Sequence, residues 1–143
     1  MRDRETFCTF SVGDLYFGVP VTRVQEVIRH QPTTKVPLAP DVIHGLMNLR
    51  GQIVPAIDLR TRLGIEPRED GNRPINVVIR TADEPISLLV DEIGDVVKVD
   101  IVDFEPPPET LSTEQRELIE GTYKLENRLL LVLDTQEVVQ VGV

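Results

Sequence analysis

An internal repeat restricts the fold of this chain more than any other feature of its sequence. The run HGLMNLRGQIVPAIDLRTRL (His44–Leu63) returns 76 positions later as EGTYKLENRLLLVLDTQEVV (Glu120–Val139). Equivalent positions keep their residue class: Gly45 and Gly121, Leu49 and Leu125, Ile53 and Leu129, Ile57 and Leu133, Asp58 and Asp134. The turn Arg50-Gly51 falls on Glu126-Asn127, where a residue that tolerates positive φ suits a tight hairpin. Such a repeat predicts two copies of one structural unit.

The segments before these runs also match. FGVPVTRVQEVIR (Phe17–Arg29) lies on ISLLVDEIGDVVK (Ile86–Lys98) at an offset of 69. Because the second offset is the longer one, the second copy contains extra residues between its two matched segments. We expect them in the proline-rich segment Asp103–Glu117, since prolines are excluded from central strands. The runs predict five strands in each copy. Those of the first copy are expected near Phe7–Val12, Leu15–Val19, Val24–His30, His44–Leu49 and Gln52–Ile57, and those of the second near Ile75–Thr81, Ile86–Val90, Val96–Val99, Leu118–Leu125 and Arg128–Leu133.

Composition agrees with a strand-rich core. Hydrophobic residues make up 41% of the 143 residues but aromatic residues only 4%, so valine, leucine and isoleucine must fill the core. We therefore predict an all-β fold with short helices, built from two tandem five-stranded small β-barrel subdomains that pack together. The expected subdomains are residues 15–74 and 86–138 of a single domain, 1–143, with the chain termini able to exchange strands between them.

Local signals predict how the strands and helices end. Asp58 is expected to cap a helix at Leu59–Leu63 that Gly64 terminates, and Asp134 is expected to cap Thr135–Val139. Leu129–Leu133 shows no polar alternation, which predicts a strand covered on both faces. Pro55 interrupts the equivalent run and indicates an edge or bulged strand.

No residue set indicates catalysis. Cys8 lies in an apolar strand, and His30 and His44 lack the spacing of a zinc site, so no cofactor, metal or reaction is expected. The cluster DEIGD (Asp91–Asp95) predicts a solvated turn. A formal charge of −9 argues against binding nucleic acid. The first ten residues contain no apolar signal segment, and no apolar run is long enough to span a membrane, so a cytoplasmic location is expected.

Three motifs resemble one known family. VQEVIR (Val24–Arg29), HGLMNLRG (His44–Gly51) and QIVPAIDLRTRLG (Gln52–Gly64) are similar to CheW, the bacterial chemotaxis coupling protein, and the similarity extends from about Thr6 to Val138. The resemblance implies an adaptor without enzymatic activity. Its partners would be the regulatory domain of the histidine kinase CheA and the cytoplasmic tip of methyl-accepting chemoreceptors. It would not insert into the membrane but would be recruited to receptor arrays there. A chain of 143 residues has no room for the kinase domains of CheA.

The resemblance also suggests partner-binding residues. Val24 and Glu26 match a stretch linked to partner binding, Arg50 matches an arginine needed for coupling, and three apolar positions match residues near the groove between subdomains. The candidate set is Val24, Glu26, Asn48, Arg50, Gly51, Val90, Val96 and Val97. The four valines could equally be core residues. Two other functions stay open: an adaptor of a non-flagellar chemosensory pathway, and a small-molecule binder or enzyme that uses the cleft between the subdomains.

Overall fold

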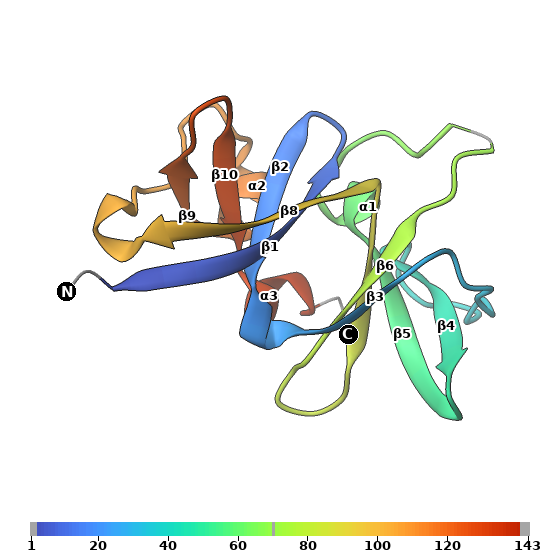
Figure 1. Cartoon of the computed structure of the whole chain (residues 1–143). Coiled ribbons are helices and arrows are strands. Elements are labelled where there is room, and N and C mark those ends of the chain that lie inside the picture. Colours follow the sequence, from blue (N-terminus) through green and yellow to red (C-terminus); the bar gives the residue numbers. More distant parts are fainter. Residues whose placement is uncertain (1–2, 70, 141–143) are drawn as a thin grey trace.

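The computed structural model describes residues 3–69 and 71–140, and within these ranges the strands form two five-stranded sheets (Figure 1). The first sheet has the order β8 (Glu92–Asp100), β1 (Arg4–Val12), β2 (Leu15–Pro20), β10 (Leu129–Leu133) and β9 (Ile119–Lys124). The second sheet has the order β3 (Val24–Ile28), β6 (Ile75–Ile79), β7 (Ile86–Val90), β5 (Gln52–Asp58) and β4 (Ile43–Leu49). The predicted all-β fold of two five-stranded units is confirmed.

The two sequence copies exchange their first hairpins. The β1–β2 hairpin of the first copy pairs with β8 and β10 of the second, and in Figure 1 this blue hairpin lies beside the red β10. The β6–β7 hairpin of the second copy pairs with β3 and β5 of the first. The first sheet therefore draws on residues 4–20 and 92–133, and the second on residues 24–90. This exchange makes the sheets differ from the expected division into residues 15–74 and 86–138.

The strand registers show that the sheets are structural copies of each other. When the residue numbers of a hydrogen-bonded pair in one sheet are shifted by the repeat offsets of 69 or 76, the result is a pair in the other sheet. Phe7 pairs with Val97 as Asn76 does with Ile28, and Val132 pairs with Gly18 as Ala56 does with Ser87. The repeat in the sequence therefore corresponds to a repeat in the hydrogen-bonded framework.

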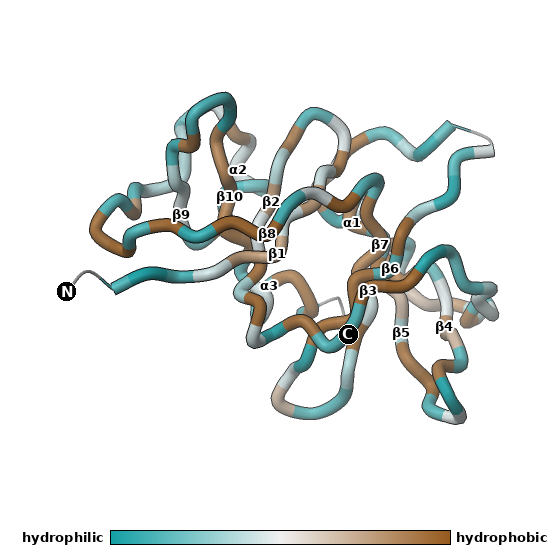
Figure 2. The backbone as a smooth tube through the Cα atoms, in the orientation of Figure 1, coloured by the Kyte–Doolittle hydropathy of each residue, from teal (hydrophilic) through white to brown (hydrophobic). Residues whose placement is uncertain are grey.

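Buried side chains form one central cluster and two smaller ones. The central cluster joins both sheets, with Phe10 and Phe17 from the first and Ile57 and Leu88 from the second. The first-sheet cluster contains Phe7, Val99, Tyr123, Leu130 and Val132, with Tyr16, Val97 and Leu125 packed against it. The second-sheet cluster contains Met47, Val54 and Val78, with Ile28 and Leu49 packed against it. Figure 2 shows apolar stretches along the strands and hydrophilic residues in the turns and loops.

Strand β10 explains the absence of polar alternation in its sequence. Leu131 and Leu133 belong to the central cluster, whereas Leu130 and Val132 belong to the first-sheet cluster. Because alternate residues of a strand point to opposite faces, both faces of β10 are covered. The prediction for Leu129–Leu133 is confirmed.

Pro55 differs from its prediction in part. Strand β5 lies inside its sheet, between β7 and β4, so it is not an edge strand. Pro55 pairs with Leu46 of β4, and the parallel pairing with β7 begins only at Ala56. The proline occupies the part of β5 that has a neighbour on one side only, where a missing N–H disrupts no ladder to β7.

The helices predicted after Asp58 and Asp134 begin where the sequence predicts and end one residue earlier than expected, whereas a third helix lies in the segment predicted to be a connection. Helix α1 (Leu59–Arg62) is capped by Asp58, whose carboxylate accepts a hydrogen bond from the N–H of Arg60. Helix α3 (Thr135–Val138) is capped in the same way by Asp134. Gly64 follows α1 with a φ of +71°. Helix α2 (Thr113–Glu117) carries a capping box formed by Ser112 and Gln115.

Two single-turn 3₁₀ segments, η1 (Val21–Arg23) and η2 (Ile101–Asp103), follow β2 and β8. In the part of the chain that the structure describes, no helix has the length and apolar character needed to cross a membrane.

Asp91 ties the two sheets together where the chain passes from β7 to β8. Its carboxylate accepts hydrogen bonds from Arg60, Arg68 and the N–H of Gly13, at distances between 2.7 and 3.0 Å. Although burial of this side chain opposes the charged form, these bonds, led by that from Arg60, hold the pKa of Asp91 below its ordinary value. The prediction of a solvated turn is wrong, because Asp91 binds two arginines that lie 31 and 23 positions away in sequence and residues 92–95 begin strand β8.

Candidate functional site

The tip of the β4–β5 hairpin brings Arg50 against Glu26 of the edge strand β3. Nη1 of Arg50 donates to Oε2 of Glu26 at 2.6 Å, and Nη2 donates to Oε1 at 2.8 Å. This is a bidentate pair, the strongest geometry available to an arginine and a carboxylate. The side chain of Arg50 stays 72% exposed, whereas that of Glu26 is 18% exposed. The carboxylate is thus largely covered, and the outer side of the guanidinium faces solvent.

The backbone of the turn accounts for this placement. Arg50 has a φ of +52° and Gly51 a φ of +85°, so both central residues take the left-handed conformation of a tight hairpin turn. The side-chain oxygen of Asn48 accepts a hydrogen bond from the N–H of Gly51 at 2.8 Å. The sequence predicted positive φ for Gly51 but gave no sign that Arg50, a residue that seldom adopts it, would do so. Asn48 and Gly51 therefore shape the turn that carries Arg50.

The electrostatics of the pair favour both charged forms. The hydrogen bond from the Arg50 guanidinium, with its positive charge, lowers the pKa of Glu26. The same contact raises the pKa of Arg50. Both side chains are therefore ionised at neutral pH, and a partner meets a fixed positive group at the hairpin tip.

The ion pair lies beside the second-sheet cluster, because Glu26 pairs across the sheet with Val78 of that cluster. Ile28 lies two residues after Glu26 on the same face of β3, and Leu49 immediately precedes Arg50. Both Ile28 and Leu49 pack against that cluster. Val27 and Ile53 are exposed apolar side chains as well, but Val27 alternates with Glu26 and Ile28 along β3 and therefore points to the other face of the sheet. The arrangement provides one oriented, exposed charge at a hairpin tip, which another protein can contact.

The four candidate valines occupy different environments. Val90 is completely buried in the central cluster, and Val24 packs against the same cluster in a half-buried position. Val97 is half-buried against the first-sheet cluster, whereas Val96 is 63% exposed on β8. The structure thus brings Glu26, Asn48, Arg50 and Gly51 together and places Val96 and Val97 on the other sheet. Val90 can act on a partner only through the packing of the core.

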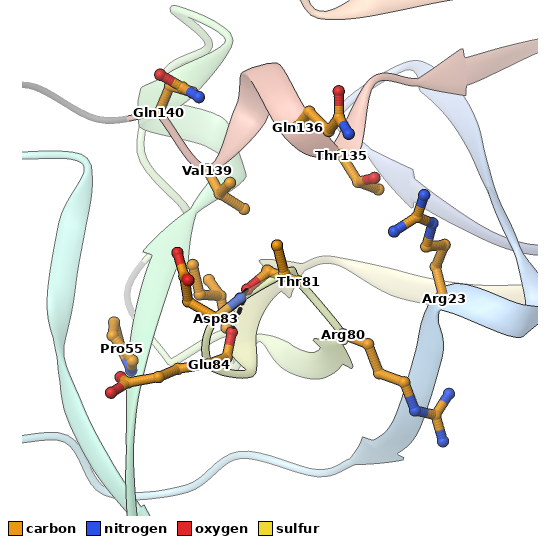
Figure 3. Close-up of a pocket in the computed structure, with 12 residues that line it drawn as sticks. Arg23, Pro55, Arg80, Thr81, Asp83, Glu84, Thr135, Gln136, Val139 and Gln140 are labelled. Carbon is orange, nitrogen blue, oxygen red and sulfur yellow. Dashed lines mark hydrogen bonds between the residues drawn. The ribbon is translucent and has the colours of Figure 1, made fainter.

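A hollow of about 750 Å³ lies where the turn between β6 and β7 faces helix α3. Figure 3 shows Arg23 and Arg80 on one side and Glu84 and Pro55 on the other, with Thr135 and Gln136 above them. The guanidinium of Arg80 donates to the carbonyl oxygens of Thr22 and Val24, so this arginine braces the start of β3. The sequence gives no sign that these residues meet, because the chain elements that form the hollow are far apart in sequence.

The described residues show neither a metal-binding cluster nor an activated thiol. Across residues 3–69 and 71–140, no group of three histidine, cysteine, aspartate or glutamate side chains is placed to hold a metal ion. Burial raises the pKa of the Cys8 thiol, which disfavours the reactive thiolate.

Comparison with known proteins gives one consistent result. A family model described as "CheW-like domain" matches residues 6–142. "Chemotaxis protein CheW" of Bacillus subtilis (strain 168) is 33% identical over 138 residues, which cover 96% of this chain and 88% of that protein. The protein of the same name from Rhizobium meliloti (strain 1021) is 32% identical over 129 residues, or 90% of this chain and 83% of that one.

A solved structure has the same fold. The scaffolding protein TtCheW from Thermoanaerobacter tengcongensis superimposes with a TM-score of 0.86 at 28% sequence identity, covering 99% of this chain and 95% of that chain. The similarity therefore includes both sheets and is not confined to the motifs around Arg50.

Proposed function

The chain belongs to the CheW family of chemotaxis scaffold proteins, and we propose that it is a non-enzymatic adaptor that couples chemoreceptors to the histidine kinase CheA. The observation that supports this role best is the Glu26–Arg50 pair at the tip of the β4–β5 hairpin. An exposed arginine held by two hydrogen bonds loses little further side-chain freedom when a partner binds it. Such preorganisation favours a contact site over a solvated turn.

Three of the candidate valines would provide a second contact. A helical hairpin of a receptor needs a few apolar anchors in a groove with a polar rim. Val24 and Val96 are the candidates with accessible surface, and Val97 would support them from the first-sheet cluster. In this proposal the regulatory domain of CheA meets the Glu26–Arg50 site, and the protein works in the cytoplasm at receptor arrays.

Co-purification with fragments of the kinase and the receptor tests the proposal. Arg50→Glu should leave the thermal midpoint near that of the wild type but weaken capture of the kinase fragment. The variant places a second carboxylate beside Glu26, so the partner would meet negative charge where the wild type presents a positive group. Arg116→Glu is the matched control, since Arg116 is exposed on α2 and the net charge changes equally. Equal capture by Arg50→Glu and Arg116→Glu would show that Arg50 has no part in coupling.

A charge swap separates the two possible roles of Arg50. The double variant Glu26→Arg with Arg50→Glu keeps a bidentate ion pair between the same two positions but reverses its polarity. If the pair only stabilises the hairpin tip, this double variant should bind as the wild type does. If the partner reads the positive charge, the swap should bind as poorly as Arg50→Glu alone.

A further inference from the structure

The interior of the second sheet contains a buried polar pair. Asn76 of β6 is 1% exposed and Ser87 of β7 is 0% exposed. Their neighbours in sequence, Val77 and Leu88, belong to the central cluster, so the polar pair points to the opposite face, toward the second-sheet cluster. The hydroxyl of Ser87 donates to Oδ1 of Asn76 at 2.8 Å, and Nδ2 of Asn76 donates to the carbonyl oxygen of Arg29 at 3.2 Å. Since a carbonyl oxygen can only accept, the amide nitrogen must face Arg29.

The first sheet has an apolar arrangement at the same positions. The repeat offset of 69 places Phe7 on Asn76 and Gly18 on Ser87. Phe7 belongs to the first-sheet cluster, and a Cβ on Gly18 would lie 3.2 Å from the Cβ of Phe7, so these two residues are in close contact. The fold thus accepts an apolar core at these positions, and burying an amide and a hydroxyl there instead contributes less to stability. The polar pair therefore provides something that packing alone does not.

The edge strand β3 depends on this amide because the strand is short. It has five residues, whereas β8, the equivalent edge strand of the first sheet, has nine. In the first sheet, backbone pairing continues past the equivalent point, where Lys98 pairs with Thr6 of β1. The pairing of β3 with β6 ends at Ile28, and Asn76 supplies a side-chain bond to Arg29 immediately beyond it.

Strand β6 and the residue that follows it therefore hold β3 at both ends. At the start of β3, the guanidinium of Arg80 donates to the carbonyl oxygen of Val24 at 2.8 Å. Just past its end, Asn76 donates to the carbonyl oxygen of Arg29. Glu26 lies between these two points, next to a register shift where the backbone ladder is interrupted. The place of Glu26 thus depends on side-chain bonds as well as on backbone pairing.

We propose that Asn76 is a positioning residue for the Glu26–Arg50 pair. Its buried amide, oriented by Ser87, fixes the end of β3 so that Glu26 stays within bidentate reach of Arg50. Strands β3 and β4 are the opposite edges of the second sheet, and no described backbone pair joins them, so the distance from Glu26 to Arg50 depends on where β3 is held. The contact role of this pair rests on the proposed function, whereas its positioning can be measured on the protein alone.

Hydrogen–deuterium exchange and carboxyl NMR titration of the full-length protein, without any partner, test the proposal. The double variant Asn76→Leu with Ser87→Ala removes the polar pair but keeps the branched shape of the amide, so the thermal midpoint should stay close to that of the wild type. The backbone amides of β3 should nevertheless exchange about five- to tenfold faster, because the strand loses the bond beyond its end. The pKa of Glu26 should rise toward its ordinary value, since the hydrogen bonds from Arg50 that lower it would form less often.

A variant of the other sheet provides the matched control. The buried hydroxyl of Thr9 also donates to a carbonyl oxygen of an edge strand, that of Asp95 in β8, so Thr9→Val removes the same kind of bond and should change neither the exchange of β3 nor the pKa of Glu26. Asn76→Ser is a second test that adds no apolar group to the core and should act in the same direction as the double variant.

Three results would overturn the proposal. The first is that both Asn76 variants keep the exchange rates and the Glu26 pKa of the wild type. The second is a change in exchange alone, because Asn76 would then stabilise β3 without positioning Glu26. The third is an equal change in Thr9→Val, which would make the effect a general one of losing a core hydrogen bond. Capture of the kinase fragment by Arg50→Glu tests the proposed function separately, so the two proposals can fail independently.

Discussion

Replacing Asp91 with alanine should lower the free energy of unfolding by about 3 kcal/mol. The carboxylate accepts four hydrogen bonds, two from Arg60, one from Arg68 and one from the N–H of Gly13. Removing it leaves Arg60 and Arg68 without this counter-charge at side-chain exposures of only 19% and 11%. It also releases the β1–β2 turn from the point where β7 continues into β8.

The size of the loss follows from burial and from what remains. A hydrogen bond to a charged group contributes about 1.5–3 kcal/mol, and breaking a buried ion pair costs about 3–5 kcal/mol. Asp91 is 18% exposed, so water screens part of these interactions. Arg68 also keeps its contacts with Asp58 and with the carbonyl oxygen of Leu89. We therefore expect a loss near the lower end of the range for a buried pair.

Urea denaturation followed by circular dichroism measures this loss, because the chain contains no tryptophan and urea does not screen charges. Asp95→Ala is the matched control: it removes an exposed aspartate from the same DEIGD run and should change stability by less than about 0.5 kcal/mol. A double-mutant cycle with Arg60→Ala should show coupling of about 1–3 kcal/mol between the two positions. A loss below about 1 kcal/mol for Asp91→Ala would refute the interpretation that this carboxylate ties the sheets together.

Three further predictions follow from the same structure. The difference in stability between wild type and Asp91→Ala should narrow as the pH falls below about 4. The pKa of Asp91 is lower in the folded protein than its unfolded value near 3.9, so the charged carboxylate stabilises the fold above that pH and loses this effect as it protonates. Thermal midpoints of both proteins at pH 7 and pH 3 measure the difference, and a constant difference would contradict the prediction. Gly121→Ala should lower the free energy of unfolding by about 2 kcal/mol or more, because its Cβ would lie 2.1 Å from a ring carbon of Phe104 and 2.6 Å from a backbone oxygen. The Cβ of Gly51→Ala would meet no atom within 4 Å, so this variant should lose only the roughly 1 kcal/mol that a positive φ costs. Equal losses of the two variants in urea denaturation would contradict this prediction. Asp58→Ala should cost about 1 kcal/mol or more, because it removes both the α1 cap and the ion pair with Arg68, and an unchanged urea midpoint would show that neither contributes.

Much of the local structure was predictable because it depends on short-range rules. The helix caps at Asp58 and Asp134, the turn at Gly51 and the doubly covered strand β10 all follow from residue type and periodicity. The candidate site was predictable only in part. Resemblance selected Glu26 and Arg50 separately, but no rule of spacing indicates that residues 24 positions apart form a bidentate pair.

The sequence by itself determined the unit of this fold: a repeated run of short strands, turns and caps, with an apolar pattern that requires two packed sheets. Only the tertiary structure decided how those units combine. Whether a hairpin pairs with its own copy or with the other cannot be read locally, since both arrangements satisfy the same strand pattern. The environments of Val90 and Val96 illustrate this, because these valines lie on consecutive strands that belong to different sheets, and one is buried whereas the other is exposed. Likewise, Asp91 and Arg50 owe their partners to long-range packing, which places charges together that the chain separates.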